Sequence, residues 1–436
     1  MNPFLSHNIR QFFNSLSSQN NPFAVLPYVF KWILTSTLLA LGIGSASALF
    51  LITLQWVTDY RSNNIELVYA LPLIGFIIGY VYYRWGTEAE GGNNTIIQAI
   101  QDNKTKVPFI MAPLVYLTTL ATHLFGGSAG REGTALQMAA GISYPIRLLS
   151  KKIKIEKKEI LIASVAGGFG AVFGTPIAGT VFALEFARIG KVSYAAILPA
   201  LLTAFLSNFV THLYPVHHTH YNIDLVPQLN LTHFGIAIIA GICFGMSAFI
   251  FSSGLNKLGI FFKSKIKYPP LRPFLGGVLL VILFKLLNTS DFMGLGIHVI
   301  QKAFIIQLPL YYFAYKIGFT LLTLASGFKG GEVTPLFFIG ATLGNALGQF
   351  LNLPIDLLAA MGFVAVFAGA ANTPLACIFM GVELFGAEAL PYIAIACIVA
   401  YLTSGPTGIY KKQIISSSKN NTHQFSENNT LENHMK

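Results

Sequence analysis

The sequence predicts an all-α integral membrane protein built as an inverted repeat, in which two similar halves of broken and tilted helices run in opposite orientations. Three observations predict it: the composition, the spacing of the apolar stretches, and a pair of motifs that each occur twice. Of the 436 residues, 54% are hydrophobic and 10% are charged. A soluble domain carries about 25% charged residues, so this chain is expected to lie within a lipid bilayer.

Apolar stretches recur along most of the chain, at residues 24–57, 67–85, 107–126, 134–149, 159–185, 193–213, 230–256, 269–288, 303–326, 334–351 and 355–403. Several are shorter than the ~20 residues that a spanning helix needs, and several contain Gly or Pro. Helices that stop midway must lie against protein or a watery cavity, because lipid cannot satisfy free backbone groups. The alternation typical of a membrane β-barrel is absent, so we expect helices.

Basic residues indicate the topology. They gather in the short flanks 151–158 and 257–267 and after Lys411, whereas residues 214–229 contain neither Lys nor Arg. A positive-inside bias places the basic flanks in the cytoplasm and makes 214–229 an external loop. Residues 24–213 and 230–410 then form two repeats of opposite orientation, which places a shared site near the bilayer midplane. The net charge of +11 does not indicate nucleic-acid binding, because no basic amphipathic domain is present.

Both chain ends are expected in the cytoplasm. Residues 1–23 form a polar segment with no apolar core of a cleaved signal peptide. Residues 411–436 are rich in Ser, Asn, Lys and Glu, which predicts a disordered tail. The three cysteines are scattered in apolar stretches, so we expect no disulfide framework, no metal site and no cofactor.

Two motifs are duplicated in the same order. Gly127-Ser-Ala-Gly-Arg-Glu-Gly-Thr134 and Gly327-Phe-Lys-Gly-Gly-Glu-Val-Thr334 share a Gly-x-x-Gly-x-Glu-x-Thr pattern at an offset of 200 residues. Thr-Pro-x-Ala segments that run to a glutamate, at 175–185 and 373–383, follow at an offset of 198. Interrupted segments in corresponding halves are the best sequence indication of a transporter's binding site.

Each glycine-rich break is followed by a long apolar run, and the start of a helix exposes four amide groups that carry about half a positive charge. Gly130 and Gly133 let the backbone approach a ligand closely. Two such starts from opposed halves would form a site for a small anion. The alternative is that these glycines only allow close helix packing. Glu132 and Glu332 favour the functional interpretation, because packing does not require an intramembrane acid.

Glu132 can act as a tethered anion. At a helix start its carboxylate competes with a free anion for the same amide groups. Protonation removes the negative charge that binds it to them. Anion movement and proton uptake then become coupled through one residue. The alternative is that Glu132 pairs with Arg131, although adjacent side chains rarely face each other well.

These residues resemble the CLC family of chloride channels and anion/proton exchangers. Gly130-Arg131-Glu132-Gly133 is similar to its gating-glutamate motif, residues 173–185 to its Asn-x-Pro-Leu-Ala-Gly segment, and residues 330–335 to its Gly-Gly-x-Phe-x-Pro motif. Tyr410 falls where the family keeps a pore-facing tyrosine. The resemblance covers about residues 25–412. It implies a CLC-like inverted repeat and a homodimer in which each subunit has its own pore.

Four departures from the family pattern are informative. Asn93 stands in place of the chloride-coordinating serine, Phe186 in place of an internal proton-transfer glutamate, and Thr134 in place of a proline. The third motif carries Glu332-Val333-Thr334 beside the pore. These features resemble the bacterial fluoride/proton antiporter branch. The resemblance implies that Asn93, Val333 and Thr334 serve fluoride and that Glu332 serves proton movement, in a bacterial inner membrane.

The sequence leaves several alternatives open. A chloride-selective CLC exchanger or a chloride channel of the voltage-gated type shares Glu132 and Tyr410. We do not expect an enzyme, because no second histidine or metal set accompanies His123. His217, His218 and His220 indicate either a metal site or, more simply, a solvated external loop. Glu185 and Glu383 would act either as proton relays or as structural caps.

Overall fold

The computed structural model describes residues 25–436 apart from 103, 220, 420–428 and 435–436. Up to residue 212 the elements are α2 (Leu26–Asn63), η2 (Ile65–Ala70), α3 (Leu71–Trp85), η3 (Thr87–Ala89), α4 (Asn93–Gln101), α5 (Met111–Leu124), α6 (Glu132–Ile142), α7 (Tyr144–Leu148), α8 (Ser150–Ile153), α9 (Lys157–Phe173), α10 (Pro176–Glu185), β1 (Arg188–Ile189), η4 (Tyr194–Ala196) and α11 (Ile197–His212). From residue 231 they are α12 (Leu231–Lys265), α13 (Leu271–Leu287), α14 (Ile297–Ile305), α15 (Tyr312–Ser326), α16 (Val333–Leu347), α17 (Ile355–Ala371), α18 (Pro374–Phe385), η5 (Ala387–Ala389), α19 (Leu390–Thr403), β2 (Ile414–Ile415) and α20 (Leu431–His434). The predicted polar segment 1–23 lies outside the described residues.

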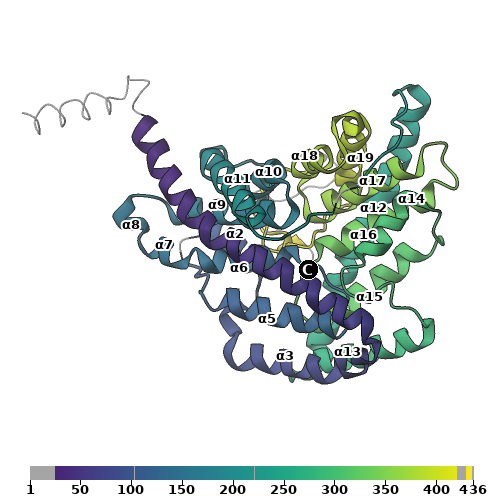
Figure 1. The fold of residues 1–436 in the computed structure, drawn as a ribbon, viewed down its shortest axis with the longest axis horizontal. Coiled ribbons are helices and arrows are strands. Elements are labelled where there is room, and N and C mark those ends of the chain that lie inside the picture. Colours follow the sequence, from purple (N-terminus) through teal and green to yellow (C-terminus); the bar gives the residue numbers. More distant parts are fainter. Residues whose placement is uncertain (1–24, 103, 220, 420–428, 435–436) are drawn as a thin grey trace, which may run out of the picture.

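The helices of the two halves recur in the same order with similar lengths. Helices α2 and α12 have 38 and 35 residues, α5 and α15 have 14 and 15, and α9 and α17 have 17 each. Most of the first half, coloured purple to teal, lies to one side of the molecule, and most of the second half, green to yellow, lies to the other (Figure 1). This order agrees with the duplication that the motifs indicate.

Two apolar stretches that the sequence leaves undivided are broken in the structure. Residues 159–185 form α9 and α10, separated at Gly174, and residues 355–403 form α17, α18 and α19, with the first break at Asn372. Both break residues have left-handed backbone angles, with φ of 74° and 60°. Gly and Asn are the residues that tolerate this conformation at the end of a helix, so Asn372 replaces Gly174 for a conformational reason.

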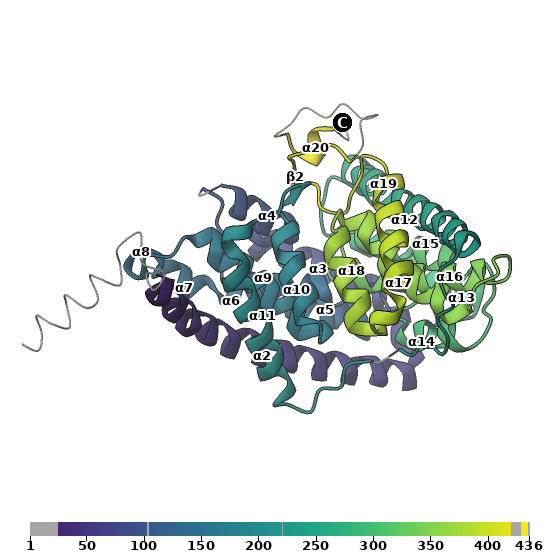
Figure 2. The same cartoon turned by 90° about the horizontal axis from the view of Figure 1, so that it is seen from above.

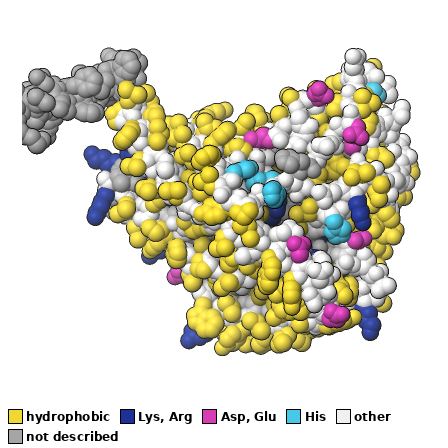
Figure 3. All heavy atoms as spheres, viewed as in Figure 1, with side chains coloured by type: hydrophobic (Ala, Val, Ile, Leu, Met, Phe, Trp, Pro, Cys, Tyr) yellow, Lys and Arg dark blue, Asp and Glu magenta, His cyan; other side chains and the backbone are white. Residues whose placement is uncertain are grey.

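Four helical segments of the described chain are long and apolar enough to cross a membrane: Leu26–Asn63, Ile65–Trp85, Tyr194–His212 and Leu231–Lys265. The shorter apolar helices include α10, α16, α17 and α18. Every residue of α17 after Ile355 is buried, so this helix is covered by protein rather than by lipid. Hydrophobic side chains dominate the outer face drawn in Figure 3, and charged side chains are sparse there.

Stacked phenylalanines fill the interior between the halves. The Phe337 ring on α16 lies 4.0 Å from Phe363 on α17, and the Phe169 ring on α9 lies 4.4 Å from Phe182 on α10, as ring centroid distances. Phe182 in turn lies 6.0 Å from Phe367 of the second half. Aromatic pairs at these distances stabilise the fold beyond the hydrophobic contribution of the area that they bury. They therefore hold the broken helices in fixed positions around the site.

The C-terminal segment corrects the prediction of a disordered tail. Strand β2 pairs in parallel with β1, with Arg188 opposite Ile414, and α20 places Leu431 against Ile189 and Ile415 in a small buried cluster (Figure 2). The prediction for 411–436 is therefore wrong for residues 411–419 and 429–434. The polar composition of the tail conceals two apolar residues, Ile415 and Leu431, whose burial anchors it to the protein.

Candidate anion-binding site

The two glycine-rich breaks meet in the interior. The amide of Gly130 donates a hydrogen bond of 2.6 Å to the carbonyl of Gly331, and the amide of Gly331 returns one of 2.7 Å to Gly130. A side chain at Gly331 would place its Cβ only 2.6 Å from the backbone nitrogen of Gly133, so this approach requires glycine. The predicted convergence of the two breaks is present, and both halves contribute to one site.

A helix begins at each break, as the sequence predicts. Helix α6 starts at Glu132 itself, two residues before the apolar stretch 134–149, and α16 starts at Val333, one residue before the stretch 334–351. Pro335 lies in the first turn of α16, where its missing N–H removes no helical hydrogen bond. The free amide groups of α16 therefore lie directly beside the Glu132 side chain, at the positive end of the helix dipole.

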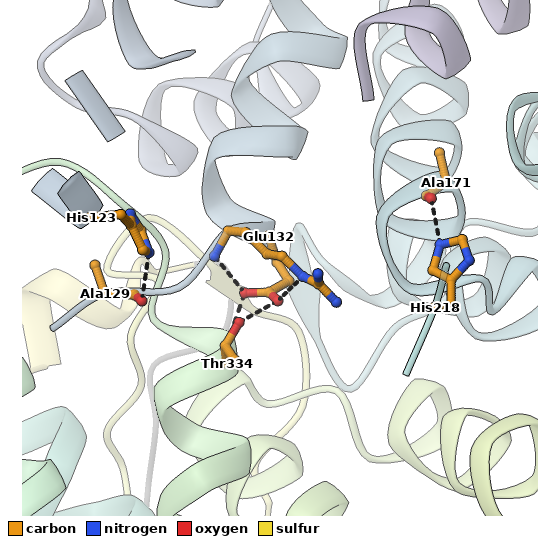
Figure 4. Close-up of polar contacts among 7 residues, drawn as sticks. His123, Ala129, Glu132, Ala171, His218 and Thr334 are labelled. Carbon is orange, nitrogen blue, oxygen red and sulfur yellow. Dashed lines mark hydrogen bonds and ion pairs between the residues drawn. The ribbon is translucent and has the colours of Figure 1, made fainter. Parts of the chain in front are cut away.

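Glu132 is completely buried, and its carboxylate is bound at the start of the opposite half's helix. Its Oε2 accepts hydrogen bonds from the amide of Thr334 at 3.0 Å and from the amide of Arg131 at 3.1 Å. Its Oε1 accepts a hydrogen bond from the Thr334 hydroxyl (Figure 4). The carboxylate thus occupies the donors at the start of α16.

Arg131 also contacts Glu132, which the sequence does not lead us to expect for neighbouring residues. The Arg131 Nε lies 3.6 Å from Glu132 Oε1, although the distance and the missing hydrogen bond at Nε make this a weak pair. The contact forms because the Glu132 side chain folds back over its own helix start. Arg131 remains partly exposed, and its charge faces the site.

Buried threonine and histidine side chains hold the backbone of the first glycine-rich break, residues 127–134, in place. The Thr119 and Thr134 hydroxyl oxygens lie 2.7 Å apart. The ring nitrogens of His123 lie 2.8 Å from the Thr119 carbonyl and 3.0 Å from the Ala129 carbonyl (Figure 4). His123 therefore holds the backbone that precedes Glu132, which is a structural role and gives no support to an enzymatic one.

Three unpartnered polar atoms converge on an inner cavity of about 530 Å³. Asn93, Glu332 and Tyr410 line this cavity, and Asn93 Oδ1, Glu332 Oε2 and the Tyr410 hydroxyl are buried without a hydrogen-bond partner among the described residues. Buried polar atoms of this kind are rare in proteins and need a ligand, an ion or water. The site residues named from the sequence are thus brought to one place.

A second, outer cavity of about 20 Å³ lies on the other side of the Glu132 carboxylate. Arg131, Glu132 and Thr334 line it together with Thr219 and Tyr221 of the loop between α11 and α12, and it shares none of its described lining residues with the inner cavity. Glu132 and Thr334 thus line the outer cavity and do not line the inner one.

Val333 lines neither of these two cavities, and its side chain is completely buried. It forms the first turn of α16. Its predicted contribution to anion binding would therefore have to come through its backbone rather than its side chain.

An aromatic ring stands where a chloride exchanger would carry a second acid. Phe186 is completely buried, and its ring lies 5.0 Å from the ring of Tyr410. The two rings close the inner side of the site with apolar surface. No ionisable group is available at position 186 to carry a proton.

Glu185 and Glu383 cap each other's helices. The carboxylate of Glu383, near the end of α18, accepts hydrogen bonds from the Ile177 and Ala178 amides at the start of α10, at 2.9 and 2.8 Å. The carboxylate of Glu185, at the end of α10, accepts from Leu375 and Ala376 at the start of α18, at 3.4 and 2.9 Å. This reciprocal arrangement favours the structural alternative for both residues, because each carboxylate is already bound to two amides.

Sequence reasoning missed one residue of the inner cavity. Gln137 of α6 lines this cavity beside Gly92, and its only signal was a single amide within the apolar stretch 134–149.

One histidine that the sequence singles out has a backbone contact. The His218 Nε2 lies 3.1 Å from the Ala171 carbonyl oxygen (Figure 4). The centroid of the His218 ring lies 5.1 Å from that of His212. No three metal-binding side chains gather anywhere in the described part of the chain, and His220 lies outside it.

Comparisons with known proteins agree with this geometry. A model of the voltage gated chloride channel family matches residues 74–405. A chloride/fluoride channel protein of Pseudomonas syringae pv. tomato is 45% identical over 401 residues, covering 91% of this chain and 89% of the relative. The H(+)/Cl(-) exchange transporter ClcA of Vibrio cholerae serotype O1 is 26% identical, with 85% and 83% covered.

Two solved structures share the fold. The crystal structure of a CLC-type fluoride/proton antiporter superposes with a TM-score of 0.86 at 35% identity, covering 88% of this chain and 98% of that one. A slow cyanobacterial Cl-/H+ antiporter superposes with a TM-score of 0.76 at 18% identity, covering 87% of this chain and 96% of that one. At that identity the second match shows a common fold alone.

Proposed function

Because this chain belongs to the voltage-gated chloride channel (CLC) family of membrane anion channels and antiporters, we propose that it is a proton-coupled fluoride exporter. In this proposal it exchanges fluoride for protons through the site around Glu132. The observation that carries the proposal is the Glu132 carboxylate bound to both donors of Thr334, beside the unpartnered Glu332. The tethered anion (Glu132), the donors for an anion (Thr334) and the second acid (Glu332) therefore lie in one site.

Exchange follows from competition for the Thr334 donors. While Glu132 is ionised, its carboxylate holds the amide and the hydroxyl of Thr334 and keeps the two cavities apart. Protonation removes the negative charge that favours this position at the helix start. A fluoride ion then takes the place of the carboxylate oxygen, and the protonated side chain moves aside. Each anion that passes is therefore linked to a protonation of Glu132.

The donor set suits fluoride. Fluoride is a compact, basic anion that forms strong hydrogen bonds, and Thr334 offers both an N–H and an O–H at one point. Removal of an anion from water is costly unless such donors replace its hydration. Asn93, where the family pattern has a chloride-coordinating serine, adds an amide side chain at the inner cavity. Fluoride, unlike chloride, can also accept a proton from a carboxylic acid.

Glu332 is the proposed proton carrier on the inner side. It lines the inner cavity, its Oε2 has no hydrogen-bond partner in the described part of the chain, and Phe186 replaces the acid that chloride exchangers use. A buried carboxyl group with no fixed partner is free to change its protonation state during transport. Protons and fluoride would then share the path that passes Glu132, Thr334 and Glu332.

The proposed setting is the inner membrane of a bacterium, with both chain ends in the cytoplasm and repeats at residues 24–213 and 230–410. Lys263 and Lys411, which border the inner cavity, support a cytoplasmic position for it. We also propose a homodimer with one pore in each subunit. Apolar side chains such as Ile177 on α10 and Leu375 on α18 are exposed, at 40% and 46%, and a second subunit can cover them. Cross-linking in membranes would test this state.

Flux through the purified protein in liposomes tests the function. With a higher fluoride concentration outside than inside and an inward proton gradient, we expect fluoride efflux against its own gradient, accompanied by proton uptake. Chloride in place of fluoride should give much less flux. Equal coupled transport of chloride would indicate the alternative of a chloride-selective exchanger, and rapid flux without proton movement would indicate a passive channel.

A further inference from the structure

The loop between α11 and α12, residues 213–230, is fastened to both halves of the chain. On the side of the first half, the His218 Nε2 lies 3.1 Å from the Ala171 carbonyl oxygen in α9. On the side of the second half, the amide of Asp224 donates a 2.7 Å hydrogen bond to the Asp356 carboxylate at the start of α17. The short segment between these two contacts therefore crosses from one half to the other.

This segment places an aromatic side chain on the wall of the outer cavity, because Tyr221 lines that cavity together with Thr219. The Tyr221 ring lies 5.0 Å from the ring of Phe304 and 5.3 Å from that of Phe363, as centroid distances. It also lies 6.0 Å from the ring of Phe385. Aromatic neighbours from α14, α17 and α18 therefore hold the Tyr221 ring in one position.

Hydrogen-bond donors border this cavity without a partner of their own. The hydroxyl groups of Thr219 and Tyr221 form no hydrogen bond within the described part of the chain, and the Arg131 Nε is buried without one. Burial raises the pKa of the Tyr221 phenol, the charge of Arg131 acts against that rise, and the Glu132 carboxylate adds to it. Tyr221 therefore keeps its proton and lies within electrostatic reach of both charged groups of the site.

The outer cavity has room for one small particle. Its volume is about 20 Å³, and a cavity needs roughly 10–15 Å³ to hold one water molecule. Fluoride is close to a water molecule in size, whereas chloride is larger. A cavity of this size that is bordered by donors therefore fits a single fluoride ion.

We propose that Tyr221 and Thr219 form, with Arg131, an outer fluoride site, and that Tyr221 determines which anion can leave through it. That the anion is fluoride rests on the proposed function. After protonation of Glu132, the anion passes from the Thr334 donors to the hydroxyl donors of the loop, beside the positive charge of Arg131. The fixed Tyr221 ring leaves too little room for chloride, so one side chain supplies both a donor and a size limit.

The alternative is that Tyr221 only packs against its aromatic neighbours while water fills the cavity. Tyr221→Phe separates these explanations, because it keeps the ring and its contacts and removes only the hydroxyl. Tyr214 supplies the matched control. It lies in the same loop, lines neither cavity, and donates through its hydroxyl to Ser45 Oγ at 2.9 Å.

The first experiment measures the binding of sodium fluoride to the purified protein by calorimetry. The Glu132→Gln protein is the parent, because its neutral side chain imitates the protonated state in which the anion reaches the outer cavity. Adding Tyr221→Phe should weaken fluoride binding by about tenfold, since a hydrogen bond to a charged group is lost. Thr219→Val should also weaken binding, whereas Tyr214→Phe should bind fluoride as the parent does.

The second experiment measures size selection. Liposomes that carry the otherwise wild-type protein are loaded with equal concentrations of sodium fluoride and sodium chloride, and the initial efflux of both anions is recorded under an inward proton gradient. Tyr221→Ala enlarges the cavity, so the ratio of chloride efflux to fluoride efflux should rise severalfold. Tyr221→Leu should shift the ratio in the same direction with less disturbance of the aromatic cluster. Tyr221→Phe and Tyr214→Ala should keep chloride excluded.

Three results would overturn the outer site: fluoride affinity that is unchanged in both Tyr221→Phe and Thr219→Val, an efflux ratio that is unchanged in both Tyr221→Ala and Tyr221→Leu, or equal effects of the Tyr214 variants. A wild-type protein that exports fluoride while these results are found would overturn the outer site alone. If the wild type exports no fluoride against its gradient, the proposed function fails. Calorimetry still tests the outer site in that case, since binding requires no proton gradient.

Discussion

The Glu132 carboxylate accepts hydrogen bonds from both the backbone amide and the hydroxyl of Thr334, a residue 202 positions away in the opposite half of the chain. This side chain lines the outer cavity and holds donors at the start of α16. Because a carboxylate can be neutralised by one proton, this contact is where the proposed function links anion and proton movement.

Replacing Glu132 with Gln should abolish proton coupling. The amide side chain keeps the size of the carboxylate but cannot lose a proton, so the tethered-anion state disappears. We expect no uphill fluoride movement under a proton gradient and no proton uptake, measured with a fluoride electrode and a pH-sensitive dye. Glu66→Gln, which changes an exposed acid in η2, serves as the control. Proton-driven uphill transport by Glu132→Gln would refute the gating role.

Replacing Glu332 with Gln should strongly reduce coupled exchange, because the inner cavity then lacks its proton carrier. The readout is the turnover of fluoride together with the ratio of protons to fluoride. Glu88→Gln, an exposed acid in η3, should behave like the wild type. Normal turnover at a normal ratio in Glu332→Gln would reduce this residue to a structural group at the start of α16.

Replacing Thr334 with Val should lower the apparent affinity for fluoride by at least about tenfold, since a hydrogen bond to a charged group contributes roughly 1.5–3 kcal/mol. Valine keeps the volume of the side chain and removes only the hydroxyl donor. Thr334→Ser keeps the hydroxyl and should restore most of the affinity. Fluoride titrations of both variants, followed by calorimetry, distinguish the two. Equal affinities for Val and Ser would show that the backbone amide suffices.

Replacing Asn93 with Ser should shift selectivity toward chloride. In the wild type we expect fluoride to outcompete chloride even when chloride is in large excess, because the site is rich in strong donors for a small anion. The serine variant restores the side chain that the family uses for chloride, so chloride should then inhibit fluoride efflux at lower concentrations. Competition curves that are identical in both proteins would exclude Asn93 from selectivity.

Replacing Glu185 with Ala should destabilise the protein by about 1–2 kcal/mol without altering the proton-to-fluoride ratio, because the carboxylate caps the start of α18. Glu383→Ala should have a similar effect through α10. Thermal melting in detergent and flux in liposomes separate the two readouts. Glu388→Ala, an exposed acid in η5, is the matched control. A changed ratio with unchanged stability would instead assign a proton relay to Glu185.

The sequence was sufficient to predict much of the fold. A low charge content, broken apolar stretches and the duplicated motifs led to an all-α membrane protein with halves that repeat, and the helices at Glu132 and Val333 begin within a few residues of their expected starts. The C-terminal segment was predicted wrongly, because composition averages over a window in which only Ile415 and Leu431 join the buried cluster.

The sequence by itself determined which residues are the candidates for the chemistry. An acid in a glycine-rich break of a membrane helix is costly wherever it lies, so Glu132 and Glu332 could be recognised without knowing their surroundings. The motif spacing also indicated that the two breaks correspond. These are properties of residue type and order along one chain, and a local pattern is enough to reveal them.

Only the tertiary structure decided which atoms meet. Distant segments are joined by the binding of Glu132 to Thr334 and by the reciprocal capping of α10 and α18 by Glu383 and Glu185. Hydrogen bonds need partners at about 3 Å and in line, which periodicity and composition do not specify. The packing of the two halves against each other sets those positions, and with them the separation of the two cavities.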